Sequence, residues 1–219
     1  MKPSVRRAGR YILAMSLLSA IAVTACSVVG IRSGTEEPRF GLVQRIGDAE
    51  VRGYASRTAA ETIVPGSAES ARGEGFRRLA GYIFGGNAGG VRIAMTAPVA
   101  QSAAGQQVAM TAPVTQAQTA EGWAIQFYLP ADLQDPPAPR DSRVRIVAVP
   151  AQTMAVLRFS GIATDSAIAA QRTRLLGLLA GSAWAPSGPA MTWFYDPPWT
   201  LPPLRRNEVA VPVMKRPPS

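Results

Sequence analysis

The chain has 219 residues, 47% of them hydrophobic, which is enough for one substantial core or at most two small domains. Its formal net charge is +9, but four basic residues lie within the first ten positions, and without them the balance is +5. No long basic run or interleaved aromatic and basic stretch occurs, so we expect no nucleic-acid partner. The sequence contains no His and one Cys, which excludes Ser–His–Asp and Cys–His catalysis and most zinc sites.

Residues 1–26 have the layout of an export signal, with positive charges, an apolar run over residues 11–23, and then Cys26. Val23-Thr24-Ala25-Cys26 resembles the bacterial lipobox, in which the Cys is lipid-modified and becomes the new N-terminus. The sequence therefore predicts a lipoprotein signal peptide with lipidation at Cys26. Two alternatives remain, a plain secretory signal and an uncleaved anchor. The anchor is an alternative because no charged residue occurs over residues 11–31, which is about the length of a bilayer span.

The positive flank of such a segment stays inside, which places the domain outside the cytoplasmic membrane. The residue after the Cys is Ser27 and not Asp, and this resembles the sorting pattern for the outer membrane. We therefore expect a domain in the cell envelope that faces the periplasm, with the outer membrane slightly favoured. Residues 27–46 read as a tether of Gly, Ser, Thr, Glu and Pro, before a domain at 47–213 and a tail at 214–219.

The first part of the domain predicts a strand followed by a helix. Glu50–Tyr54 and Thr58–Val64 predict one long or bent strand, which Pro65-Gly66 ends. Ser67 is a suitable N-cap, so a helix is expected to begin there and to end at Gly85-Gly86-Asn87.

This predicted helix carries an apolar face at helical spacing, formed by Phe76, Leu79, Tyr82 and Ile83. It also contains glycines, each of which weakens a helix by up to about 1 kcal/mol relative to Ala. The small residues indicate either close packing on a sheet or a flat ligand against the helix.

Two near copies of one segment follow, Arg92-Ile93-Ala94-Met95-Thr96-Ala97-Pro98-Val99 and then residues 108–114, and a shorter echo, Ala-Met-Thr, occurs at 190–192. Their alternation predicts a β-hairpin, with Met95 and Met110 on its inner side. Because Met also fills gaps in cores, that side is either core packing or a surface that lines a ligand. Pro98 cannot donate a ladder hydrogen bond and should lie at a strand end, an edge or a bulge.

The second half of the domain repeats the pattern of the first. We expect strands over 123–129, 144–159, 189–195 and 208–213, and a second helix that is capped by Thr164-Asp165, carries Ile168, Leu175, Leu176 and Leu179 on one side, and has Gly181 past its end. Thr58 and Thr153 lie 95 residues apart, and Met95 and Met191 lie 96 apart. This spacing predicts an ancient duplication, and hence one α+β unit with a pseudo-two-fold repeat of β-α-β-β halves.

The two Met-Thr-Ala-Pro-Val copies, together with Asp196-Pro197-Pro198-Trp199 and Arg205-Arg206-Asn207-Glu208-Val209, resemble the SOUL haem-binding family. The resemblance extends from about Gly47 to Val211. It implies a distorted antiparallel β-barrel with two helices. It also implies that haem or a related tetrapyrrole is bound by an apolar surface with basic groups near the propionates.

The resemblance implies a set of candidate haem contacts in this sequence. They are the apolar residues Phe76, Leu79, Tyr82 and Ile83, the methionines Met95 and Met110, and the cations Arg77, Arg78, Arg205 and Arg206. Since His is absent, we expect weak or no axial ligation of the iron. Alternatively, Arg77 and Arg78 form a solvated helix face, and Tyr82 is a core aromatic residue.

The carboxylates are scattered, and no glycine loop suited to phosphate follows a strand, so we expect no enzyme activity. The predicted function is therefore haem binding by a membrane-anchored envelope lipoprotein. The alternative from another class is a structural or protein-interaction envelope module that binds no small molecule.

Overall fold

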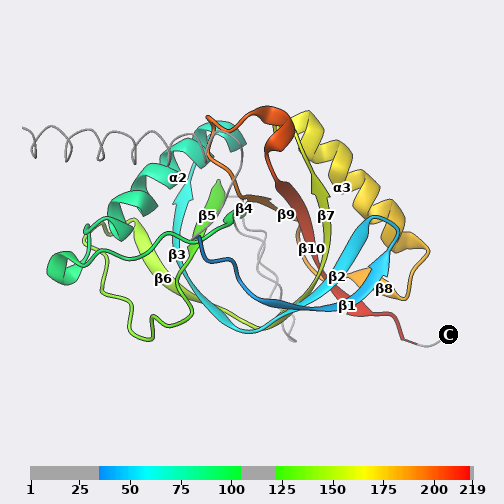
Figure 1. The fold of residues 1–219 in the computed structure, drawn as a ribbon, viewed down its shortest axis with the longest axis horizontal. Coiled ribbons are helices and arrows are strands. Elements are labelled where there is room, and N and C mark those ends of the chain that lie inside the picture. The colour runs from blue at the N-terminus through cyan, green and yellow to red at the C-terminus, as the bar shows by residue number, and fades with distance from the viewer. Residues whose placement is uncertain (1–34, 105–121, 218–219) are drawn as a thin grey trace, which may run out of the picture.

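A ten-stranded antiparallel sheet curls around a concave inner face, and two long helices cover its outer face (Figure 1). The computed structural model describes residues 35–104 and 122–217. The strands are β1 Phe40–Ile46, β2 Ala49–Tyr54, β3 Arg57–Val64, β4 Val99–Ala103, β5 Trp123–Tyr128, β6 Val144–Val149, β7 Gln152–Phe159, β8 Trp184–Pro186, β9 Met191–Phe194 and β10 Asn207–Lys215. The helices are α2 Ala68–Ile83 and α3 Asp165–Ala180, with short 3-10 turns η1 Ala88–Gly90 and η2 Pro202–Leu204.

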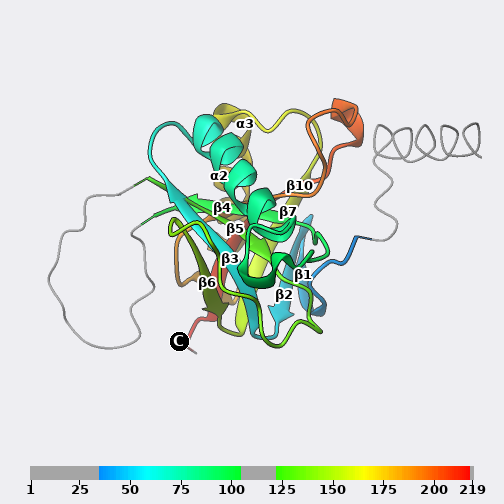
Figure 2. The ribbon, with the colours of Figure 1, turned by 90° about the vertical axis from the view of Figure 1, so that its left-hand side faces the viewer.

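The strand order is β1-β2-β7-β10-β9-β4-β5-β3-β6, and β8 pairs with β10 beside this path. Strands β1 and β6 end the path at opposite edges, and no described strand joins them, so the barrel is open. The architecture is the α+β distorted barrel that the sequence predicted, with both helices on one side of the sheet (Figure 2).

The sheet has the predicted pseudo-two-fold repeat. Strands β3, β4 and β5 with α2 form one half, and β7, β9 and β10 with α3 form the other, with the β4–β9 ladder at the centre. Each half also receives a strand from the other, since β2 pairs with β7 and β6 pairs with β3. Because of this exchange, neither half buries its apolar surface alone. The Ala-Met-Thr echo does not mark equivalent positions, because Met191 begins β9 whereas Met95 precedes β4.

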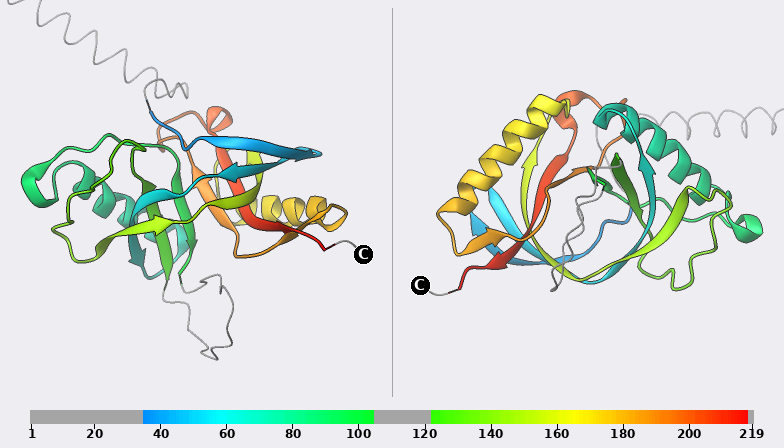
Figure 3. Two further views of the ribbon diagram at one scale, coloured as in Figure 1. Left: turned by 90° about the horizontal axis from the view of Figure 1, so that it is seen from below. Right: turned by 180° about the vertical axis from the view of Figure 1, so that it is seen from behind.

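Both helices begin at the predicted caps. The Ser67 hydroxyl accepts a hydrogen bond from the Ser70 amide, and the Thr164 hydroxyl accepts one from Ala167. The N-terminal ends of α2 and α3 lie next to each other, and the helices diverge from there (Figure 3). Leu176, predicted to lie on the buried side of the second helix, is instead 39% exposed, because the narrow buried stripe of α3 is already filled by Ile168, Leu175 and Leu179.

The core has three parts, two between the helices and the sheet and one on the inner face. Under α2, Leu79 and Ile83 pack against Ile125 and Phe127, and under α3, Leu175 and Leu179 pack against Leu157 and neighbouring valines. The inner part contains aromatic side chains, which are Tyr54, Tyr128 and Trp193, packed with Met154 and small residues. Strand alternation produces this division, because successive side chains point to opposite faces.

The ordered domain begins earlier than the sequence indicated. Residues 40–46, expected in the tether, form strand β1, which pairs with β2 from Phe40↔Tyr54 to Ile46↔Ala49. All but the last of its residues are exposed, so the strand lacks the buried periodic face that sequence patterns report.

The first Met-Thr-Ala-Pro-Val copy is not a strand of a hairpin. Strand β4 begins at Val99, where the copy ends, and pairs with β5 and β9. Pro98 thus precedes the strand, as its missing N–H required. Met95 is 37% exposed and does not lie on an inner side, because the chain before β4 is irregular and does not alternate. The second copy, with Met110, lies outside the described residues.

Candidate functional site

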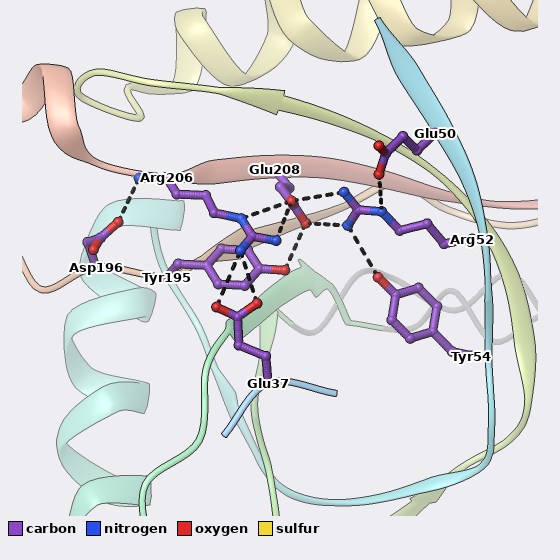
Figure 4. Close-up of polar contacts among 8 residues, drawn as sticks. All are labelled: Glu37, Glu50, Arg52, Tyr54, Tyr195, Asp196, Arg206 and Glu208. Atoms are coloured by element: carbon purple, nitrogen blue, oxygen red, sulfur yellow. Dashed lines mark hydrogen bonds and ion pairs between the residues drawn. The ribbon is translucent and has the colours of Figure 1, made fainter. Parts of the chain in front are cut away.

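The inner face of the sheet holds a buried polar network centred on Glu208 (Figure 4). The Glu208 carboxylate, 0% exposed, accepts hydrogen bonds from Arg52 at 3.0 and 3.3 Å and from Arg206 at 2.8 and 3.1 Å. The Tyr195 hydroxyl donates a further bond at 2.8 Å. A buried carboxylate is tolerated when it is paired and fully hydrogen-bonded in this way.

The Arg-Arg-Asn-Glu-Val motif builds this network because it leads into β10, which begins at Asn207. Arg206 and Glu208, two residues apart, contact each other on the inner face, and the Arg206 amide donates to an Asp196 oxygen at 2.6 Å. The Arg206 guanidinium also binds both Glu37 carboxylate oxygens, at 3.0 and 3.3 Å. Arg205 donates at 2.7 Å to the Thr200 carbonyl and also to the Pro198 carbonyl.

The two arginines expected near the propionates, Arg205 and Arg206, both have partners within the chain. Both guanidinium groups bind groups of this chain, Arg206 to the buried Glu208 and the part-exposed Glu37, and Arg205 to backbone carbonyls of the β9–β10 loop. Through these bonds Arg206 holds the inner network and Arg205 holds the loop.

The charges of the network fix its protonation. Burial alone would raise the pKa of the Glu208 carboxyl, but the charges and hydrogen bonds of Arg52 and Arg206 outweigh burial and lower that pKa. Burial, followed by the charge of Glu208, raises the pKa of the Tyr195 hydroxyl. At neutral pH the carboxylate is therefore ionised and the phenol is a neutral donor.

The outer face holds an open cleft between the first residue of α2 and the N-terminal half of α3. Its volume is about 340 Å³. Its floor is the central β4–β9 ladder with Trp123 of β5, and its sides are the N-terminal half of α3 and Ala68, the first residue of α2. The lining residues are Ala68, Gln101, Ala103, Trp123, Asp165, Ile168, Ala169, Arg172, Ala190 and Thr192.

The cleft combines small side chains, one aromatic residue and few charges. Ala169 and Arg172 are exposed on α3, one turn apart, so the helix presents a methyl group beside a guanidinium. Asp165 supplies the negative charge, in the first turn of α3. Arg72 of α2 stacks on Phe194 at 4.4 Å, and burial lowers the pKa of its guanidinium despite nearby Glu69 and Asp165.

The predicted apolar floor on α2 is mostly core. Leu79, Tyr82 and Ile83 are 0, 2 and 1% exposed, and the Tyr82 hydroxyl donates to the Pro137 carbonyl at 3.0 Å. Phe76 is 39% exposed and contacts Phe127 edge-on, with ring centroids 5.3 Å apart. The helical spacing predicted this apolar face correctly, but the face packs against the sheet. Tyr82 is therefore a core aromatic residue, which was the alternative interpretation.

The two predicted cations on α2 bind Glu74 of the same helix. Arg77 contacts Glu74 at 2.6 Å, and Arg78 contacts the other oxygen at 2.9 Å. Arg78 also donates to Thr62 and to the Ile63 carbonyl, which ties the helix to β3. Both arginines lie outside the lining of the interhelical cleft.

Sequence reasoning missed the residues that line the cleft, above all Trp123, Ala169 and Arg172. Alanines in a helix carry no signal of their own, and Arg172 is one of many arginines. The predicted pseudo-two-fold repeat was the signal that could have found them, because it places two helix starts on either side of one axis.

Among residues 35–104 and 122–217, no three His, Cys, Asp or Glu side chains gather where they could hold a metal ion. Within the same residues, no helix combines the length and apolarity needed to cross a bilayer.

The family model described as SOUL heme-binding protein matches residues 35–212. None of the curated proteins matches the sequence. Among solved structures, the C-terminal domain of EcmrR has a TM-score of 0.53 at 13% identity, with 77% of this chain and 98% of that one covered. An uncharacterized conserved protein from Listeria innocua has a TM-score of 0.52 at 9% identity, with 83% and 94% covered.

EcmrR in a DNA complex gives a TM-score of 0.56 at 10% identity, and the match covers 77% of this chain but only 57% of that one. At such identities the likeness concerns the fold alone.

Proposed function

Because this chain belongs to the SOUL haem-binding protein family, we propose that it binds haem or a related tetrapyrrole and catalyses no reaction. The family model covers the described domain except its last residues, from within β10 onward. We also propose that the protein is a lipoprotein of the cell envelope, anchored through Cys26 and facing the periplasm. The support for this location is the export-signal layout of residues 1–26 and the resemblance to a lipobox.

The observation that carries the binding proposal is the interhelical cleft. Its volume of about 340 Å³ falls in the range of ligand pockets, roughly 300–1,000 Å³. Trp123 and Ile168 offer apolar surface to a flat ring, and the exposed Arg172 offers a cation to a carboxylate. The proposed site has the chemistry that the sequence predicted, an apolar surface with an arginine. Its location is the space between the helices and not the α2 face.

The donor set of the cleft fits a tetrapyrrole but not a ligated iron. Its lining contains no Met, Tyr, Cys or His among the described residues, so no side chain there is suited to an axial position. Bound haem would supply a redox-active iron, whereas this chain's residues would supply apolar contact and one cation. We therefore propose reversible binding that depends on the ring and its carboxylates more than on the metal.

Titration of the purified protein with haemin, followed at the Soret band, tests the proposal. We expect a saturable change at micromolar haemin, and protoporphyrin without iron should compete for the same site. Ala169→Trp fills the cleft from an exposed helix position and should weaken binding by about tenfold or more, as the loss of about 1.4 kcal/mol does. Ala170→Trp is the matched control, since Ala170 is exposed on the same helix outside the cleft lining.

The charge of the cleft has its own pair of variants. Arg172→Ala should weaken haemin binding, because a guanidinium bound to a carboxylate contributes a charge-assisted hydrogen bond. Arg77→Ala, which removes an exposed cation bound to Glu74, should leave it unchanged. Equal effects of the two variants would mean that total charge, and not the cleft, attracts the ligand.

One observation favours the second candidate, a structural or protein-interaction module that binds no small molecule. The inner face is filled by the protein's own side chains and leaves a space of only about 10 Å³. A flat haemin titration would select this candidate. The mass of the protein extracted from membranes tests the location separately, because a lipid adduct on Cys26 is large.

A further inference from the structure

A short N-terminal segment lies across the aromatic part of the inner face. We call residues 36–40 the strap. The Glu36 carbonyl accepts the Ala97 amide at 2.9 Å, and a Glu36 carboxylate oxygen accepts the Ala131 amide at 3.1 Å. Glu37 binds Arg206 through both oxygens. These contacts are few and partly exposed, so residues 36–39 are held at points, and only Phe40, the first residue of β1, pairs along a ladder, with Tyr54 of β2.

Beneath the strap lies a hollow walled by aromatic rings. Tyr54, Tyr128, Trp193 and Tyr195 surround it together with Arg57 and Pro98, and Glu37, Pro38 and Phe40 of the strap also line it. The space left is about 10 Å³, near the minimum that admits one water molecule. With the strap in this position, the hollow has little free space.

An arginine inside the hollow has donors to spare. The Arg57 guanidinium lies over Tyr54 at 4.6 Å and over Tyr128 at 4.5 Å. Its Nε and Nη1 atoms are buried, and neither has an acceptor among the described residues. Buried donors without an acceptor are costly and rare, and they point to an acceptor that reaches them in another state of the site.

The strap itself shows what kind of group the hollow accepts. Glu37 places a carboxylate on the Arg206 guanidinium, and Phe40 places a ring under the Arg52 guanidinium, with its centroid at 4.5 Å. Phe40 also contacts Tyr54, with ring centroids 5.5 Å apart. One carboxylate and one flat ring, joined by a short chain, are thus bound on the inner face by arginines and tyrosines.

We infer that the hollow is a second binding site, for a flat aromatic carboxylate, and that the strap is its built-in competitor. With the strap lifted, Glu37 leaves, and the guanidinium groups of Arg52, Arg57 and Arg206 face Glu208 and the part-exposed Glu50. The surplus positive charge and the tyrosine rings then suit a ligand carboxylate and a ligand ring. This site lies on the face of the sheet opposite the interhelical cleft, and the inference does not depend on haem binding.

The test uses the fluorescent probe pyrenebutyrate, which joins a flat ring to a carboxylate, with pyrenemethanol as the uncharged probe. Glu37→Gln keeps the size of the side chain but weakens its hold on Arg206. Only molecules with the strap open can bind the probe, so the apparent affinity equals the intrinsic affinity multiplied by the open fraction. Because the variant should raise the open fraction, we expect it to bind pyrenebutyrate about tenfold more tightly than wild type. Asp48→Asn is the matched control, since it weakens an exposed pair with Arg174 and makes the same charge change.

The double variant Glu37→Gln with Arg57→Gln identifies the site. We expect it to return pyrenebutyrate affinity to the wild-type level or below, and to leave the haemin titration as in wild type. The inference is overturned if Glu37→Gln binds pyrenebutyrate like wild type, if the double variant binds as tightly as the single one, or if pyrenemethanol binds equally well.

A measurement on the wild-type protein keeps the inference testable if a variant does not fold. The amides of Ala97 and Ala131 donate to Glu36, so lifting the strap exposes both. Saturating pyrenebutyrate should therefore speed hydrogen exchange at these two amides and not at Ala71, whose amide donates to the carbonyl of Ser67, the N-cap of α2. Probe binding with unchanged exchange at both would show that the strap does not compete.

Discussion

Glu208→Gln tests whether the buried network is built around an ionised carboxylate. The substitution keeps the shape of the side chain but leaves one oxygen to accept where two oxygens now accept from Arg52, Arg206 and Tyr195. The new amide N–H groups would face guanidinium donors. Breaking a buried ion pair by removing one partner costs about 3–5 kcal/mol. For a domain of this size we expect a fall in Tm of roughly 6–20 °C.

The pH dependence of this difference follows from the lowered pKa of Glu208. Because the folded pKa lies below the unfolded one, of about 4.3, the stabilisation is complete above that pH and is lost as pH falls through the folded pKa. Urea unfolding followed by circular dichroism from pH 7 to pH 3 should therefore show a constant difference between wild type and Glu208→Gln down to about pH 5, and a shrinking one below about pH 4.

Asp48→Asn is the control for this measurement. Its pair with Arg174 is exposed, and such pairs contribute about 0–1 kcal/mol. A loss below about 1 kcal/mol for Glu208→Gln, or a difference that does not change down to pH 3, would refute the reasoning that an ionised Glu208 organises the inner face.

Two further predictions concern packing, and thermal unfolding measures both. Gly75→Ala should destabilise the domain by about 1–3 kcal/mol, because the new Cβ would lie 2.5 Å from Ile125. Gly73→Ala in the same helix should instead stabilise it by about 0.5–1 kcal/mol, because the space around Gly73 is open. Leu79→Ala should cost about 2–5 kcal/mol, and Leu176→Ala much less, because the first side chain is 0% and the second 39% exposed. If Gly75→Ala is neutral or Leu176→Ala costs as much as Leu79→Ala, the packing described for the two helices is wrong.

Local patterns predicted the helices and the fold class well, and the physical reason is plain in particular residues. Ser67 and Thr164 cap the helices through bonds to amides three residues on, which depend on sequence alone. The apolar spacing of Leu79 and Ile83 also marked a buried face correctly. Strand β1 was missed because its residues are exposed on both faces and show no period.

The candidate site was harder to predict because its parts come from distant segments. A helical pattern tells which face is apolar but not whether sheet or ligand covers it, and for Tyr82 and Leu79 the sheet does. Arg206 looked like a free cation because its partner Glu37 is 169 positions away in the sequence. The cleft itself is defined by alanines, whose small size matters only once the helices are placed.

The central claim is that a tetrapyrrole binds between the two helices of this SOUL family member. Haemin titration of wild type and Ala169→Trp side by side, read at the Soret band, tests it most directly. The account predicts saturation at micromolar haemin for wild type and a loss of about tenfold or more for the variant, since a filled cleft excludes the ring. Equal affinity of the two proteins, or no saturable change in either, would contradict it.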